Sequence, residues 1–289
     1  MNLTEALLPA LRSTLWQGTL LFAFPLFISL LIYTSERLVT GWFIKTTGYK
    51  GIWLTAWLGA PVHESSHALM CFLFRCPIKE VRFFIPDPES QVLGYVKYTH
   101  NPRNPLHWIG RWFIGLAPLF AGSAFLLGLL MLSGSFPVTW RADLLPGQSH
   151  DWLSVLGLHI QTLNLAGSEL FSLLSKGSFW QNPFNWLILY VSLAVVTHMA
   201  PSFADLKGTL PGWIFMFVLV FLFNYVLLSF GIVISGENLL YFISLLMTKL
   251  LALALVLSAI NLIFWFLVLN VIHRLKTGYW LMGRQHKGK

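Results

Sequence analysis

Three residues within one short apolar stretch have the types and the spacing of a zinc site. The stretch GAPVHESSHALMCFLFRC (59–76) contains His63, Glu64 and His67. Residues four apart lie on one face of a helix, one turn from each other, so the two imidazoles could bind one tetrahedral zinc ion. Glu64 points in a neighbouring direction, from which it could reach a water-filled fourth position. H-E-x-x-H is the pattern of hydrolases in which zinc acidifies water and the glutamate is the general base.

The alternative explanation is a chance match whose histidines are ordinary core residues. The chain has nine His and seven Glu in 289 positions. At that frequency about 0.01 chance matches to the pattern are expected. Of the eleven acidic residues, we predict that only Glu64 lies deep within a membrane span. An ionisable group at that depth costs several kcal/mol, which favours a functional role.

The composition predicts an all-α polytopic membrane protein. The chain is 56% hydrophobic and only 10% charged. A soluble domain carries about 25% charged residues. In such a protein a net charge of +8 is expected to lie in cytoplasmic loops beside anionic lipid, and it does not indicate nucleic-acid binding.

We predict about six transmembrane helices, because six apolar stretches have roughly the 17–25 residues needed to cross a bilayer. They are 15–34, 51–73, 108–133, 184–200, 211–235 and 246–273. The tail 274–289 holds five Lys and Arg residues, which predicts a cytoplasmic C-terminus. An even number of spans then places the N-terminus on the cytoplasmic side as well. A multi-pass protein of a bacterial inner membrane fits this description.

Two connections carry further predicted structure within a single membrane-embedded domain, 1–289. Residues 78–100 alternate β-branched and aromatic residues around a Pro-Asp-Pro-Glu-Ser turn, which predicts a cytoplasmic-side β-hairpin between the second and third spans. The segment 134–180 is predicted to be an extracytoplasmic loop with an interfacial or re-entrant helix. If that helix spanned the membrane instead, the count would be seven and the charge argument would fail.

A catalytic zinc ion usually has three protein ligands and one water, so a third ligand is needed. The best candidate stretch is VVTHMAPSFADLKG (195–208), which offers Asp205 and His198. Asp205 is the favoured ligand, although Ser202 and Asp205 also form the S-x-x-D pattern of a capping box that opens a helix. His198 could be the ligand itself, orient Asp205 or form a hydrogen bond to the site.

In these motifs the chain resembles the site-2 protease family of zinc intramembrane metalloproteases. The resemblance covers roughly 50–208 and consists of HESSH in an early span, the following hairpin, the small-residue segment GLAPLFAG, and Asp205-x-x-Gly208. It implies that His63, His67 and Asp205 hold zinc and that Glu64 is the base. The family's Asn-Pro…Asp-Gly pattern is not intact, and the 74–106 connection is too short for a PDZ domain. The chain therefore resembles a divergent branch.

The expected function is that of a zinc-dependent intramembrane endopeptidase with one Zn²⁺ per chain. Its partners would be a membrane-protein substrate and the lipid bilayer, and the oligomeric state is left open. One alternative is a membrane zinc hydrolase of a small amide or lipid-linked substrate. Another is a non-enzymatic metal-binding membrane protein, for which Glu64 would be dispensable.

Overall fold

The computed structural model describes residues 3–89, 92–134, 136–137, 152–232 and 237–281. The chain is mostly helical, with one small sheet. Its helices are α1 (Leu3–Thr47), η1 (Tyr49–Ile52), α2 (Trp53–Leu73), α3 (Pro105–Leu132), α4 (Trp152–Ser175), α5 (Gly177–Gln181), α6 (Pro183–Val196), α7 (Phe203–Ser229) and α8 (Glu237–Thr277). Its strands are β1 (Ile78–Arg82) and β2 (Tyr95–Tyr98).

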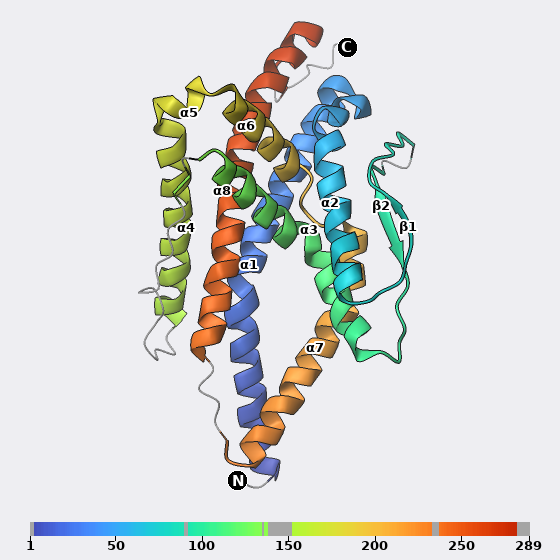
Figure 1. The fold of residues 1–289 in the computed structure, drawn as a ribbon, viewed down its shortest axis with the longest axis vertical. Helices are drawn as coiled ribbons and strands as arrows, with labels where there is room; N and C mark the ends of the chain where they lie inside the picture. The colour runs from blue at the N-terminus through green and yellow to red at the C-terminus, as the bar shows by residue number, and fades with distance from the viewer. Residues whose placement is uncertain (1–2, 90–91, 135, 138–151, 233–236, 282–289) are drawn as a thin grey trace, which may run out of the picture.

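Two long helices, α1 and α8, form the centre of the bundle. They lie side by side along the long axis of the molecule, and α4 runs beside α8 (Figure 1). Helix α3 contacts α2, α7 and α8. The main core includes Ile32 of α1, Leu126 of α3 and Leu257 of α8, each almost fully buried. Helices α2 and α7 both pack directly against α3, which is the arrangement that the candidate site requires.

Four helices in the described part of the chain are long and apolar enough to cross a bilayer. They are α1, α3, α7 and α8, which contain most of the first, third, fifth and sixth predicted spans. The second predicted span, 51–73, corresponds to α2, whose 21 residues are not apolar enough to count with them. The fourth, 184–200, overlaps α6, whose 14 residues extend only ~21 Å against a hydrocarbon thickness of ~30 Å. The prediction of about six spans is therefore not confirmed.

The direction of the central helices bears on the predicted sidedness. Figure 1 shows α1 and α8 running in the same direction, with the start of α1 at one end of the molecule and the end of α8 at the other. Two parallel helices that each cross a bilayer once begin on one face and end on the opposite face. The arrangement does not support an even number of spans with both termini on the cytoplasmic side.

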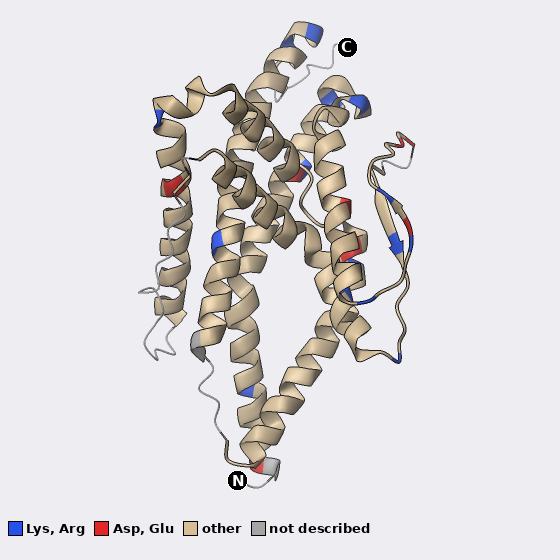
Figure 2. Cartoon of the chain, in the orientation of Figure 1, with Lys and Arg blue, Asp and Glu red and all other residues tan. Residues whose placement is uncertain are grey.

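The apolar surface of the helices is compatible with a membrane protein. Helix α7 buries few of its apolar side chains, and Leu210 and Phe223 are more than half exposed. Charged residues are sparse along the helices, and several gather on the hairpin (Figure 2). Soluble proteins rarely expose contiguous apolar surface on this scale, whereas lipid covers it without cost.

The predicted β-hairpin at 78–100 is confirmed. Strands β1 and β2 pair antiparallel, with Val81 opposite Val96 and Arg82 opposite Tyr95. On one face, Glu80 accepts hydrogen bonds from the Tyr95 hydroxyl at 2.7 Å and from Lys97 at 3.1 Å. These bonds, with one from Arg82, lower the pKa of Glu80 to about 2. The polar face of the hairpin is thus held together by cross-strand contacts to one carboxylate.

The predicted outer segment 134–180 is described only in part. Its loop residues 138–151 lie outside the described residues, and its second half forms α4 beside α8. Glu169 of α4 and Lys249 of α8 form an ion pair at 3.0 Å in which both side chains are buried. Glu64 is therefore not alone among the acids in being enclosed by helices. The interpretation of 134–180 as an interfacial or re-entrant segment stays a prediction.

Candidate metal centre

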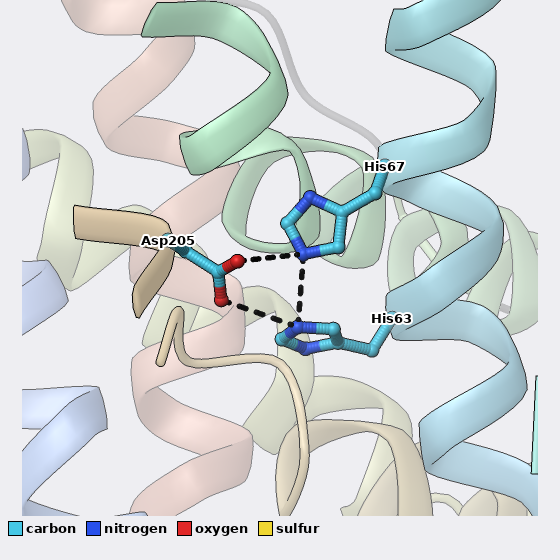
Figure 3. A group of neighbouring side chains, drawn as sticks. All are labelled: His63, His67 and Asp205. Atoms are coloured by element: carbon cyan, nitrogen blue, oxygen red, sulfur yellow. Dashed lines mark hydrogen bonds and ion pairs between the residues drawn. The ribbon is translucent and has the colours of Figure 1, made fainter. Parts of the chain in front are cut away.

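Helix α2 places the two histidines of the H-E-x-x-H pattern side by side, as their spacing predicts. The helix is continuous from Trp53 to Leu73, so His63 and His67 lie one turn apart on one face. Their Nε2 atoms are 3.1 Å apart (Figure 3). His67 is almost fully buried, and His63 is partly exposed. Both rings point toward the start of α7.

Asp205 comes to the histidines from the first turn of α7. Its Oδ1 lies 3.4 Å from Nε2 of His67, and its Oδ2 lies 3.7 Å from Nε2 of His63 (Figure 3). Asp205 also completes a capping box, in which its Oδ2 accepts a hydrogen bond from the backbone N–H of Ser202 at 2.7 Å. The capping and site-forming interpretations of Asp205 are therefore compatible, because one carboxylate does both.

Backbone carbonyls determine which ring nitrogen of each histidine is available. Nδ1 of His63 donates to the carbonyl oxygen of His198, and Nδ1 of His67 donates to that of Ile114, both at 2.7 Å. A carbonyl can only accept, so each Nδ1 carries a hydrogen and each Nε2 of a neutral ring presents a lone pair. Histidines that bind metals are commonly oriented in this way.

The converging atoms have the spacing of metal ligands. Two imidazole lone pairs and a carboxylate face one another, and the three ligand atoms lie within 4.8 Å of one another. Around a tetrahedral zinc ion with bonds of ~2.0–2.1 Å, neighbouring ligand atoms are roughly 3.3 Å apart. The two Nε2 atoms are 3.1 Å apart, and the distances of 3.4 and 3.7 Å from them to the two different Asp205 carboxylate oxygens are close to that value. His63, His67 and Asp205 could therefore hold a divalent metal ion, whose charge would offset the repulsion among them.

Glu64 lies next to this group and lines the same cavity. The cavity has a volume of about 680 Å³, and its walls include Glu64 and all three candidate ligands. The Glu64 side chain is buried. A carboxylate enclosed beside these candidate metal ligands, with open space before it, is placed to exchange a proton with a molecule in the cavity.

Strand β2 presents its edge to the cavity. All seven residues from 92 to 98 line it, whereas the lining includes none of the five residues of β1, all of which are described. A strand that turned one face to the cavity would contribute every second residue, so the unbroken run indicates an edge. Among the described residues the sheet has two strands, and no described strand lies along the far edge of β2. An extended peptide could pair there.

Gly94 of the hairpin lies close to the candidate base Glu64, and its substitution tests their contact. A Cβ atom at Gly94 would lie 2.7 Å from the carbonyl oxygens of Arg82 and Phe83 and 2.9 Å from Cγ of Glu64. We expect Gly94→Ala to displace β2 and to lower any hydrolytic activity of the site at least ~10-fold, because misplacement by about 1 Å can cost more than that. Metal content should not change. Gly128→Ala is the control, because no heavy atom lies within 4 Å of a Cβ added there. Full activity of Gly94→Ala would contradict the placement of the hairpin beside Glu64.

His198 contributes to the site through its backbone and not through its ring. Its Nε2 lies 2.9 Å from the hydroxyl of Thr55, while its carbonyl oxygen holds the ring of His63. An added Cβ at Gly59 would lie 2.6 Å from the His198 ring, so α2 and the end of α6 approach closely here. Of the two ligand candidates in 195–208, the side chain of Asp205 is the one that faces the histidines.

Glu36 is a residue of the cavity that sequence analysis missed. It lines the cavity, and its Oε2 accepts a hydrogen bond from the backbone N–H of Ala200 at 2.9 Å. The first span was predicted to end at 34, which left Glu36 outside it, whereas α1 continues to Thr47. The apolar positions Ile32, Val39 and Phe43 are buried at helical spacing, and this continued periodicity is the signal that could have revealed it.

The structure thus brings His63, Glu64, His67 and Asp205 to one cavity and places His198 behind His63. Comparison with protein-family models, with curated proteins and with solved structures finds no match to this chain. The function proposed below follows from the residues and the geometry of the site itself.

Proposed function

We propose that this protein is a zinc-dependent endopeptidase that cleaves a peptide bond in or near a membrane-spanning segment of its substrate. One observation carries the proposal: a group of metal-ligand geometry, an adjacent carboxylate and the edge of a β-strand share a single cavity. The first two supply hydrolytic chemistry, and the third supplies a means of holding an extended peptide. The long apolar helices support a membrane setting.

Each side chain has a distinct role on this proposal. His63, His67 and Asp205 would hold zinc, and the carbonyls of His198 and Ile114 keep the two imidazoles in the required tautomer. When bound, zinc supplies a Lewis acid that polarises a carbonyl group and acidifies water. Glu64 accepts the proton of the attacking water and donates it to the leaving amine.

The β2 edge addresses a difficulty specific to membrane substrates. The amides of a membrane helix are enclosed in its own hydrogen-bond ladder, so the helix must unwind before cleavage. An unwound segment needs new hydrogen-bond partners, which strand addition to β2 would provide. The edge lines the cavity that contains Glu64, so a paired segment would pass beside the base.

We further propose membership in a divergent, PDZ-free branch of the site-2 protease family. The order of an H-E-x-x-H helix, a hairpin and a later aspartate supports it, together with the meeting of His63, His67 and Asp205 in one group. A membrane hydrolase of a small amide or lipid-linked substrate is the second candidate. It is favoured by the cavity volume of about 680 Å³, which is within the range of small-molecule sites.

The test combines metal analysis with cleavage by the purified chain in lipid nanodiscs. We expect about one zinc per chain and cleavage of some members of a panel of single-span substrates, at a peptide bond that mass spectrometry locates in or near the span. Removal of the metal with a chelator should stop cleavage, and added zinc should restore it. A chain that binds no zinc would contradict the metal centre. A chain that binds zinc and hydrolyses only small amides would favour the second candidate.

A further inference from the structure

The break between α6 and α7, residues 197–202, supplies two parts of the metal centre. At one end of the break, the carbonyl oxygen of His198 accepts the Nδ1 hydrogen of His63. At the other end, Ser202 begins α7 and sets the position of Asp205 through the capping box. The relative position of one imidazole and the carboxylate ligand therefore depends on the path of this non-helical segment.

Side chains from three other helices hold the break in place. Thr55 of α2 bonds the ring of His198 at 2.9 Å, and Asn261 of α8 donates to the hydroxyl of Thr197 at 3.0 Å. Glu36 of α1 accepts from the N–H of Ala200 at 2.9 Å. Ala200 lies between His198 and Ser202, so the contact from α1 acts midway between the two parts that build the site.

Ala200 is a point at which such a contact matters. Its N–H lies outside both α6 and α7, where no helical ladder provides an acceptor. The following residue, Pro201, has no backbone N–H, so it cannot donate a hydrogen bond that would hold the break in place of the Ala200 N–H. Ala200 itself is buried. Without the Glu36 carboxylate, the buried Ala200 N–H would have lost its hydrogen-bond acceptor. An unsatisfied buried donor costs free energy, which would favour a shift of the 197–202 backbone.

We propose that Glu36 is a positioning residue of the metal centre, which fixes the 197–202 break by accepting the Ala200 N–H and so sets the distance between Asp205 and the histidines. The inference rests on the metal centre of the proposed function. The contact needs an acceptor atom at the end of a side chain of the length of Glu, and it does not need a negative charge. This distinction separates positioning from a purely electrostatic effect.

Cobalt binding measures the geometry of the site without any substrate. Tetrahedral Co²⁺ absorbs visible light much more strongly than octahedral Co²⁺, so a titration reports affinity and coordination together. The chain in nanodiscs, freed of metal, would be titrated as wild type and as Glu36→Gln, Glu36→Asp and Glu36→Ala. Gln keeps an acceptor oxygen at the same reach. Asp keeps the charge but is one methylene shorter. Glu169→Ala, at a buried acid outside the cavity lining, is the matched control, and melting temperatures are recorded for all.

We expect Glu36→Ala and Glu36→Asp to weaken Co²⁺ binding roughly 10-fold or more, the loss typical of residues behind metal ligands, and to weaken the tetrahedral absorption. Co²⁺ affinity of Glu36→Gln should stay within about twofold of wild type, and Glu169→Ala should lower the melting temperature without changing the spectrum.

Two results would overturn the inference. One is a wild-type spectrum and Co²⁺ affinity in both Glu36→Ala and Glu36→Asp. The other is Co²⁺ binding that Glu36→Asp retains and Glu36→Gln loses. If Glu36→Ala does not fold, the Asp and Gln variants decide. A wild-type chain that binds no metal overturns both proposals, whereas a chain with the expected Co²⁺ pattern but no peptidase activity overturns the proposed function alone.

Discussion

Glu64→Gln is expected to keep its metal and to lose cleavage by about 10²- to 10⁴-fold, the range for removal of a general acid–base group. The amide of Gln has nearly the shape of the carboxylate, so the packing of α2 and the positions of His63 and His67 should be preserved. It cannot accept the proton of the attacking water. Because Glu64 lines the cavity but is not part of the ligand group, metal binding and cleavage should separate.

The measurement is zinc content and cleavage rate on the same preparation. Glu169→Gln serves as the control, because it removes the charge of a buried carboxylate on α4, in contact with α8 and outside the cavity lining. It should retain both zinc and activity. Wild-type cleavage by Glu64→Gln would remove the assigned base and favour the non-enzymatic interpretation of the metal group. Loss of zinc from Glu64→Gln would show that the residue supports the ligands instead.

Asp205→Ala is expected to lower zinc affinity by more than about 100-fold and to abolish cleavage. Loss of residues behind a metal site costs about 10- to 100-fold, and loss of a ligand should exceed that. In the structure the Asp205 carboxylate is the group from α7 that meets both histidines, at 3.4 and 3.7 Å. Without it, two imidazoles remain, which are too few for a stable catalytic zinc site.

Asp205 also belongs to a capping box, so the control must separate the two roles. Ser202→Ala removes the capping hydroxyl, which accepts from the Asp205 N–H at 3.2 Å, and leaves the carboxylate in place. We expect it to reduce the stability of the α7 start by ~1 kcal/mol while zinc is retained. If Asp205→Ala kept zinc and His198→Ala lost it, His198 would be the third ligand. The orientation of the Asp205 carboxylate toward the histidines would then be a consequence of helix capping alone.

The local features of the site were predictable, because their causes are local. Helix periodicity alone places His63 and His67 on one face, since residues four apart return to the same side after about one turn. The alternating β-branched and aromatic residues around a Pro-Asp-Pro turn likewise predicted the hairpin, in which β1 pairs antiparallel with β2. Both depend on residues within a few positions of one another.

The number of spans was not predictable in the same way, because neighbouring helices decide where a helix ends. The first span was expected to end at 34, yet α1 continues to Thr47, since Val39 and Phe43 are buried in a cluster with Trp265 of α8. Hydropathy marks the apolar part of a helix and not the amphipathic extension that packs against a partner. Glu36 lies in this extension of α1, so hydropathy did not place it within the predicted span.

The sequence by itself determined which chemical groups the protein has and which of them share a helix face: two imidazoles and a carboxylate in one stretch, with Asp205 and His198 as candidates far along the chain. Only the tertiary structure shows which of those two side chains lies beside the histidines, and it is that of Asp205. Both lie near the break after α6, and the path of that break turns the Asp205 carboxylate toward the histidines and the His198 ring toward Thr55. That path depends on contacts from α1, α2 and α8, which come together only when the bundle has packed.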